Sequence, residues 1–249
     1  MRPTNEDCFA IEDDLRLCIV ADGIGGHHGG DVAARLAVDA VSEFIRERAR
    51  PTEPATDPWP LGYDDGLSDA GNLLRTAIQL AGLRILEAAV TDTDLVGMGT
   101  TIVSALLRGD RLAVAHVGDS RLYVAGQGRL RLLTEDDSWM ATILARQPSA
   151  DASHFRHHPM RGALTNVVGS RIGTDVHVVE ETLEGGELLL LTTDGVHDTL
   201  DDMEIARQVY GGEHRSEPRD LAARLVATAI ARGSHDNCTA VVARYDPSR

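Results

Sequence analysis

The chain has 249 residues, of which 43% are hydrophobic but only 4% aromatic, and its formal net charge at pH 7 is −15. A chain of this length buries a substantial core, which this composition fills mainly with Leu, Val, Ile and Ala. The negative charge argues against a surface for nucleic acid or anionic membranes and suits a protein that concentrates cations.

The cysteines and the first residues indicate where the protein works. Cys8, Cys18 and Cys238 are odd in number and form no C-x-x-C pair, so neither a disulfide framework nor a zinc ribbon is indicated. No apolar run approaches the ~18 residues of a membrane span. The N-terminal segment is acidic where a signal peptide would be basic and then apolar. These features predict a cytoplasmic protein.

The first third of the chain contains a strand, a glycine-rich turn and a helix. After a short strand at 8–11, residues 17–21 form a continuous apolar run, which predicts a strand covered on both faces. This run ends on Asp22, and five glycines between 23 and 30 allow a tight turn and the close approach of a ligand. Asp31 is placed to cap a helix predicted at 31–48. A carboxylate above such a turn is suited to holding a cation.

Glycine-rich turns also bind phosphates, so two nucleotide-binding patterns are the alternatives. A P-loop needs Gly-Lys before Ser or Thr, and this chain contains no lysine, because all 24 of its basic residues are arginine. A dinucleotide-binding G-x-G-x-x-G pattern fails at its last position, where His28 stands. The sequence therefore excludes the first pattern and disfavours the second.

The middle of the chain has a polar loop, a helix and a series of strands. The loop is predicted at 50–71 and the helix at 73–90, and strands follow at 100–107, 112–117, 122–124 and 130–133. Gly109 and Asp110 suit a hairpin turn. The break at 118–120 leaves Asp119 at a strand end.

The last part begins with a short helix at 138–146 and a polar, mobile segment at 147–161. Strands at 176–182 and 188–193 come next, and the second leads into Asp194. Helices at 201–209 and 218–231 precede Asp236, which stands before a closing strand at 239–244.

Four aspartates share one kind of position, at a strand end or start beside Gly, Asn or Ser: Asp22, Asp119, Asp194 and Asp236. Each alone is typical of a turn. Strand ends in one sheet system can converge on one edge, and Mg²⁺ and Mn²⁺ favour clustered carboxylates and carbonyls. All four together, with N-E-D at the start of the chain, predict a metal site.

These residues lie within an ordered series of short motifs. Residues 2–7 match the motif R-x-x-N-E-D. Residues 20–31 match V-A-D-G-M-G-G-H-x-x-G-E, with Ile24 in place of Met and Asp31 in place of Glu, and residues 99–101 match G-T-T. Residues 118–121 match G-D-S-R, and residues 158–165 match H-P-x-R-x-x-L-T. Residues 193–195 with Asp198 match T-D-G with a following acid, and residues 236–239 match D-N-x-T. Over nearly its whole length the chain thus resembles the metal-dependent serine/threonine protein phosphatases, called PPM or type 2C, and especially their bacterial branch.

The resemblance implies an α+β fold with residues 1–249 as one domain: a four-layer α-β-β-α sandwich of two stacked, mainly antiparallel sheets flanked by helices. It implies a dinuclear Mn²⁺ or Mg²⁺ centre at one edge between the sheets. Asp22 matches the ligand that bridges the two metals, and the other ligands match Glu6, the Gly23 carbonyl, Asp194 and Asp236. In bacterial members a third, weaker metal uses the positions of Asp119 and Asp194. Arg2 matches the arginine that holds the substrate phosphate, and Asp7 and Asn237 are expected to support the site.

The implied activity is hydrolysis of phosphoserine and phosphothreonine in proteins by a metal-activated water. Four ligand carboxylates and two divalent cations balance in charge, so the centre can accept a phosphate dianion. A serine/threonine kinase and its targets are the implied partners, and we expect a monomer that binds neither nucleic acid nor membrane. Two other functions stay open: a non-catalytic module that binds phosphorylated proteins, and a hydrolase of small phosphate metabolites.

The chain departs from the family pattern in three places. The strand that normally precedes the arginine is missing before Arg2, which predicts weakened substrate affinity or a shortened chain. Ile24 follows the Asp-Gly where animal members have a histidine, so His27, His28 or a metal-bound water could serve as the general acid. Asp137 replaces the histidine of D-H-S ahead of a flap at 147–161, whose solvated histidines are His154, His157 and His158.

Overall fold

The computed structural model describes residues 2, 4–25, 29–49, 59–147, 158–211 and 217–247. Sheet 1 contains β1 (Asp7–Glu12), β2 (Leu17–Ile24), β3 (Gly99–Thr100), β4 (Ile102–Arg108), β5 (Arg111–Val117) and β8 (His177–Thr182). Sheet 2 contains β6 (Arg121–Gly126), β7 (Arg129–Leu132), β9 (Leu188–Thr192) and β10 (Ala240–Arg244). The strand orders are β1-β2-β4-β5-β8, with β3 paired to β2, and β10-β9-β6-β7, and the strand pairs are antiparallel.

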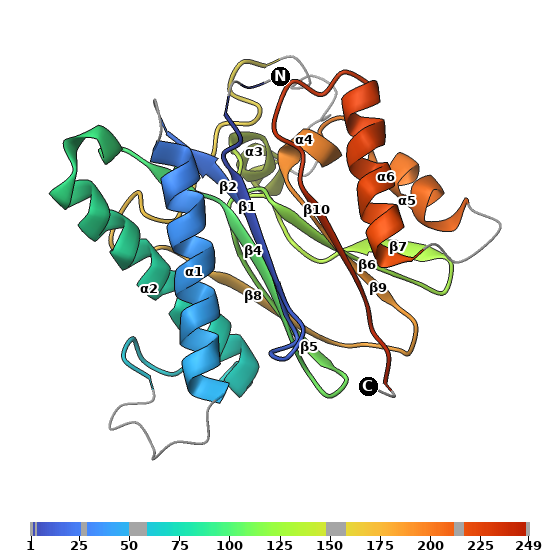
Figure 1. The fold of residues 1–249 in the computed structure, drawn as a ribbon, viewed down its shortest axis with the longest axis horizontal. Helices are drawn as coiled ribbons and strands as arrows, with labels where there is room; N and C mark the ends of the chain where they lie inside the picture. Colours follow the sequence, from blue (N-terminus) through green and yellow to red (C-terminus); the bar gives the residue numbers. More distant parts are fainter. Residues whose placement is uncertain are drawn as a thin grey trace.

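Helices cover the outer faces of the two sheets (Figure 1). On sheet 1 lie α1 (Gly29–Ala49) and α2 (Asp69–Thr91), which leads into the short helix η1 (Thr93–Leu95). Beside sheet 2 lie α4 (Asp194–His197), α5 (Asp202–Tyr210) and α6 (Pro218–Ala231), while α3 (Trp139–Arg146) follows β7 in the chain. Among the described residues, none of the helices is both long and apolar enough to span a membrane.

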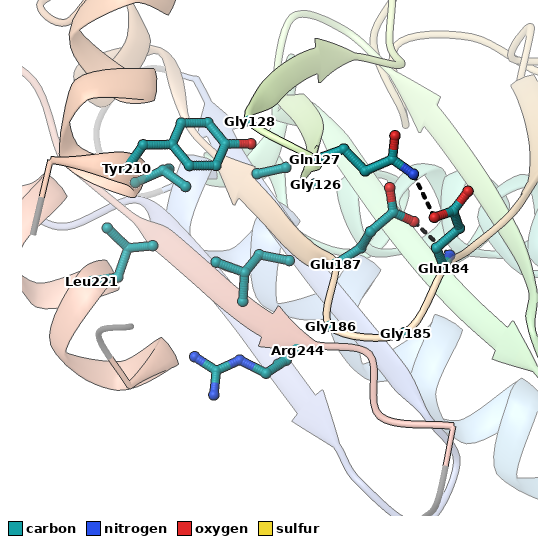
Figure 2. A pocket seen from close by; sticks show the side chains of 13 residues that line it. Gly126, Gln127, Gly128, Glu184, Gly185, Gly186, Glu187, Tyr210, Leu221 and Arg244 are labelled. Carbon is teal, nitrogen blue, oxygen red and sulfur yellow. Dashed lines mark hydrogen bonds between the residues drawn. The ribbon is translucent and has the colours of Figure 1, made fainter. Parts of the chain in front are cut away.

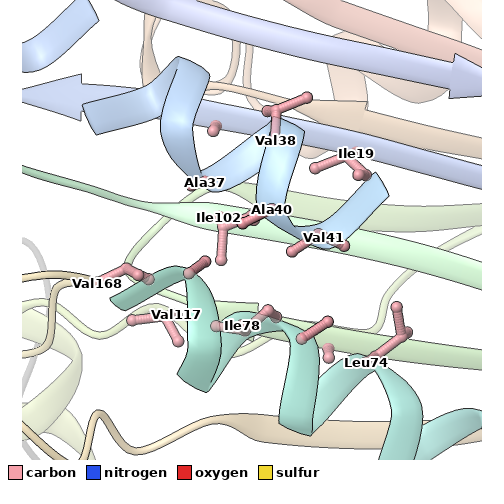
Figure 3. Close-up of a cluster of buried hydrophobic side chains, with 14 of the residues drawn as sticks. Ile19, Ala37, Val38, Ala40, Val41, Leu74, Ile78, Ile102, Val117 and Val168 are labelled. Carbon is pink, nitrogen blue, oxygen red and sulfur yellow. The ribbon is translucent and has the colours of Figure 1, made fainter. Parts of the chain in front are cut away.

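Three clusters of buried hydrophobic side chains lie between these layers and hold them together. The first joins α1 and α2 to sheet 1, and Figure 3 shows Val41 of α1 and Ile78 of α2 beside Ile19 and Ile102 of the sheet. The second lies between the two sheets, and the third joins sheet 2 to α5 and α6. Because successive side chains on a strand point to opposite faces, the apolar residues 17–21 of β2 alternate between the first and the second cluster. The four-layer α-β-β-α sandwich is therefore confirmed.

Several predicted boundaries were wrong near the turns. Strand β2 continues to Ile24, so Asp22 lies within the strand, because Gly23 and Ile24 pair with β3. Helix α1 begins at Gly29, so Asp31 is not its cap but an acidic residue of its first turn, where the helix dipole favours it. The predicted strand at 100–107 is divided between β3 and β4 at Thr101.

Other differences concern the loops. Helix α2 begins at Asp69, because the Ser68 hydroxyl accepts a hydrogen bond from the Gly71 N–H and so caps the helix. The predicted loop at 50–71 therefore ends earlier, and its residues 50–58 lie outside the described part of the chain, as do residues 148–157 of the predicted flap. The four-residue helix α4 was not predicted.

The strand register brings one end of each sheet to the same place. In sheet 2, Thr192 at the end of β9 pairs with Arg121 at the start of β6 and with Ala240 at the start of β10. Segments that precede β6 and β10 or follow β9 thus gather at one end. In sheet 1 the end of β2 pairs with β3. This shared end carries the candidate site.

Candidate metal centre

A pocket of about 230 Å³ opens at this end of the sandwich, and five carboxylates from five chain segments line it with one guanidinium. We call it the carboxylate pocket. Its ionisable residues are Arg2, Glu6, Asp22, Asp119, Asp194 and Asp236, and Gly23, Thr101 and Leu164 complete part of the wall. Every residue predicted to bind metal or phosphate therefore lies in one place.

Asp22 is held through its backbone. Its N–H donates to the Thr101 hydroxyl at 3.1 Å, and its carbonyl accepts from the Thr101 N–H at 2.8 Å and from the Thr100 hydroxyl at 2.8 Å. The side chain is thereby left to face the pocket. Sequence reasoning quoted these threonines as a motif but missed this task, because the contact depends on where β2 ends.

Burial and repulsion perturb the carboxyl groups of the pocket. Burial is the main cause that raises the pKa of Asp22 well above its ordinary value, and the negative charges of Asp7 and Asp194 raise it further. Burial is also the main cause that raises the pKa of Asp119 to about 7 and that of Asp194 to about 6. Several like charges in a partly dry pocket are unfavourable unless cations balance them.

Asn237 joins the N-terminal segment to the segment before β10 at the pocket. The Glu6 N–H donates to Asn237 Oδ1 at 2.9 Å, and Asn237 Nδ2 donates to the Thr4 carbonyl at 3.1 Å. The Asn237 N–H donates to Asp236 Oδ1 at 2.9 Å. Asn237 therefore holds Glu6 and Asp236 beside each other.

Asp7 lies behind the pocket and ties β1 to sheet 2. Its Oδ2 accepts from the Thr193 hydroxyl at 3.0 Å, and Thr193 Oγ1 accepts from the Thr239 N–H at 3.0 Å. Burial raises the pKa of Asp7. Thr193, which sequence reasoning quoted only as part of the T-D-G motif, links the segments that carry Asp194 and Asp236.

Arg2 contacts the pocket through its guanidinium. Nη2 lies 2.8 Å from Asp236 Oδ2, and Nη1 lies 3.9 Å from Glu6 Oε2. The Arg2 side chain is 53% exposed, so half of it faces open solvent at the pocket mouth. An arginine at this place can meet an incoming anion.

The donor set fits hard divalent cations, which prefer carboxylate and carbonyl oxygens. Buried Oδ1 atoms of Asp7 and Asp194 have no hydrogen-bond partner within the described part of the chain, so these oxygens are available. Across the described ranges, no three His, Cys, Asp or Glu side chains stand in a ready ligand geometry. The carboxylate oxygens would therefore move toward a cation when one binds.

The histidines predicted for acid catalysis and for the flap are only partly placed. His27, His28, His154 and His157 lie outside the described residues. His158 stacks on the Trp139 ring at 4.5 Å between centroids, and its Nδ1 accepts from the Met160 N–H. His158 is thus engaged with α3.

A larger cavity, of about 420 Å³, lies at the opposite end of sheet 2 (Figure 2). Two glycine turns, Gly126 to Gly128 and Gly185 to Gly186, face Tyr210, Leu221 and Arg244 across it. Its carboxylates already have partners, since Glu184 accepts from Gln127 and Glu187 from the Glu184 N–H. The carboxylates of this cavity are therefore already engaged in hydrogen bonds with the protein.

Comparison with known proteins gives one consistent family. A family model described as Protein phosphatase 2C matches residues 3–228. The serine/threonine phosphatase stp of Listeria monocytogenes is 30% identical over 250 residues, which cover 99% of this chain and 92% of that protein.

Solved structures agree with the sequence matches. A Mycobacterium tuberculosis serine/threonine phosphatase, PstP/Ppp, superposes with a TM-score of 0.81 at 29% identity, over 99% of this chain and 94% of the other. The catalytic domain of a serine threonine protein phosphatase PstP, solved in complex with two manganese ions, gives 0.78 at 28% identity, over 98% and 93%.

Proposed function

Because this chain is a serine/threonine protein phosphatase of the protein phosphatase 2C family, we propose that it hydrolyses phosphoserine and phosphothreonine with a water activated at a dinuclear Mn²⁺ or Mg²⁺ centre. The convergence of five carboxylates and Arg2 on one pocket supports this most strongly. Bound there, divalent cations acidify a water and neutralise the charge that develops on the phosphoryl group.

The ligands divide between the two sheets. Asp22, within the last residues of β2, would be a ligand shared by two cations, with Glu6 and the Gly23 carbonyl completing one site. Asp194 and Asp236 would complete the other, and Asp119 with Asp194 would hold a third, weaker cation. Asn237 and Asp7 support the site by fixing the segments of Glu6, Asp236 and Asp194.

Arg2 would bind the substrate phosphate, since the guanidinium fork matches two phosphate oxygens. Its contact with Asp236 keeps it within reach of the centre. The substrates are phosphorylated proteins, and we propose that a serine/threonine kinase and its targets supply them. We also propose that residues 1–249 act as one catalytic domain, since both sheets contribute ligands.

Hydrolysis of a phosphothreonine peptide with Mn²⁺, Mg²⁺ or excess chelator tests this function. We expect activity only with metal, and a fall of about a hundredfold or more in Asp22→Ala and Asp194→Ala, because a metal stabilises the transition state by several kcal/mol. Asp175→Ala, which removes an exposed carboxylate, is the matched control.

Two outcomes would oppose the proposal. An intact chain that binds Mn²⁺ by calorimetry but does not turn over the peptide would indicate a module that binds phosphorylated proteins. Faster hydrolysis of nucleotides than of the peptide in a competition assay would indicate a hydrolase of small phosphates.

A further inference from the structure

Asp137 lies behind the carboxylate pocket and holds the turn that carries Asp119. The Gly118 N–H donates to Asp137 Oδ2 at 2.9 Å, and the Asp137 N–H donates to the Gly118 carbonyl at 2.9 Å. Gly118 has φ +93°, and a Cβ there would lie 2.7 Å from the Thr101 side chain. The residue before Asp119 is thus fixed on both of its backbone polar groups.

The same residue also holds the segment that follows Leu164, another residue of the pocket lining. The Asp137 carbonyl accepts from the Thr165 N–H at 2.8 Å, and Oδ2 accepts from Asn166 Nδ2 at 2.9 Å. Asn166 Nδ2 donates as well to the Asp175 carbonyl at 2.7 Å. Leu164, next to these residues, lines the pocket. Asp137 therefore contacts both the turn before Asp119 and the segment after Leu164, the first through its side chain and backbone and the second likewise.

His177, at the start of β8, holds the other oxygen of this carboxylate. Its Nε2 lies 2.9 Å from Asp137 Oδ1. Because a carboxylate only accepts, Nε2 carries the hydrogen whether the ring is neutral or protonated. The ring stacks on His116 at 5.0 Å between centroids, which fixes its plane. With Oδ1 bound to His177, Oδ2 faces Gly118 and Asn166.

We propose that Asp137, oriented by His177, is a positioning residue for the metal centre: it holds the Gly118 turn and thereby places the Asp119 carboxylate in the pocket. This rests on the proposed function. Asp137 stands where the family pattern D-H-S has its histidine, and in this chain its carboxylate binds both the Gly118 N–H and His177.

Mn²⁺ titration by calorimetry, together with the Mn²⁺ dependence of peptide hydrolysis, tests the proposal in four variants. We expect Asp137→Ala to weaken the Asp119-dependent Mn²⁺ site about 10- to 100-fold, as is usual when a group that orients a ligand is removed. The rate at saturating Mn²⁺ should recover toward that of the intact chain. His177→Leu should shift the same site in the same direction, and His177→Gln, whose amide N–H can still donate, should restore it. Asp175→Ala removes a nearby exposed carboxylate and should change nothing.

The proposal would be overturned if folded Asp137→Ala bound Mn²⁺ as tightly as the intact chain does. It would also be overturned if Asp137→Ala and Asp175→Ala changed the Mn²⁺ affinity equally. Should Asp137→Ala fail to fold, the His177→Leu and His177→Gln pair decides, because equal Mn²⁺ affinities in both also overturn it. Failure of the proposed function is a separate result: the intact chain would then show no metal-dependent hydrolysis, while calorimetry would still report on Asp137.

Discussion

At the scale of single residues, the carboxylate pocket concentrates buried negative charge. The pKa of Asp119 is raised to about 7 and that of Asp194 to about 6, mainly by burial. Between about pH 4 and pH 7 these groups bind more protons in the folded protein than in the unfolded chain. Their contribution to stability without cations therefore falls as the pH rises through this window, and bound cations reverse it.

We expect the increase in Tm caused by Mn²⁺ to grow from about pH 5 to about pH 8, because at low pH the metal must displace protons from Asp119 and Asp194. Thermal melts with Mn²⁺ and with chelator at each pH measure this increase. Burial lowers the pKa of His116 to about 4 and that of His197 well below its ordinary value. Both histidines titrate in the melts with Mn²⁺ and in those with chelator, so their contributions to Tm largely cancel in the Mn²⁺-induced increase.

The double variant Asp119→Asn, Asp194→Asn is the control for this pH dependence, since an amide does not titrate. Its Mn²⁺-induced increase in Tm should be small and nearly flat with pH. An increase in the intact chain that shrinks toward pH 8 would contradict the assignment of these carboxylates to the metal centre.

Arg2 should oppose metal binding while it favours substrate binding, because its guanidinium lies 2.8 Å from Asp236 Oδ2. We expect Arg2→Ala to bind Mn²⁺ severalfold more tightly and to raise KM for a phosphopeptide about tenfold, as loss of a charged hydrogen bond does. Calorimetry and steady-state kinetics measure the two effects. Arg84→Ala, which breaks a surface ion pair with Glu43, is the control. An unchanged KM would remove Arg2 from the phosphate site.

At the scale of elements, periodicity predicted the long helices and most strands but not the short pieces around the site. Helix α6 occupies the predicted range 218–231. Helix α4 has four residues, too few to show a period of 3.6. The division of the predicted strand at 100–107 follows from hydrogen bonds between Thr101 and Asp22, which are tertiary contacts that no local pattern contains.

Gly195 in α4 lies against the Asn237 backbone, whereas Gly82 in α2 has room for a side chain, so we expect alanine to change stability in opposite directions at these two positions. A Cβ at Gly195 would lie 1.9 Å from the Asn237 carbonyl oxygen, whereas one at Gly82 in α2 meets its neighbours at 3.5 Å or more. We expect Gly195→Ala to destabilise the protein by about 1–3 kcal/mol and to weaken Mn²⁺ binding, since it separates Asp194 from Asp236. Gly82→Ala should stabilise it by up to about 1 kcal/mol.

Urea unfolding of both glycine variants, each with calorimetric Mn²⁺ titration, measures these effects. Gly82→Ala also serves as the matched control, because it adds the same methyl group at a residue that does not line the pocket. A Gly195→Ala protein with the stability and Mn²⁺ affinity of the intact chain would show that α4 and the Asn237 turn can move apart freely.

At the scale of the whole molecule, the predicted strand ends and the motifs indicated which residues meet, but composition did not. The sheet order β10-β9-β6-β7 places strands distant in sequence beside each other, and only this register gathers Asp119, Asp194 and Asp236. The strand-end positions of these aspartates predicted that they converge, and the resemblance to a family assigned their roles. It did not supply the hydrogen bonds of Thr101 and Thr193, since these depend on the paired geometry of both sheets.

Cations at the pocket would connect the two sheets, because Asp22 belongs to sheet 1 while Asp194 and Asp236 adjoin sheet 2. We expect Mn²⁺ to slow amide hydrogen exchange together at the pocket ends of β2, β9 and β10, by reducing local opening. The hairpin turn at Gly109 and Asp110, at the far end of sheet 1, should not change. Protection limited to one sheet would contradict a centre shared between them.

The hydrogen bond from Glu6 to Asn237 spans 231 residues, and the ion pair of Arg2 with Asp236 spans 234. Contacts at such separations carry a large loop-closure entropy and form late in folding. We therefore expect the pocket to be completed after the main folding barrier, when most of both sheets is already built. Metal ions would then leave the folding rate nearly unchanged and slow unfolding instead, so they lengthen the lifetime of the native state rather than guide the chain toward it.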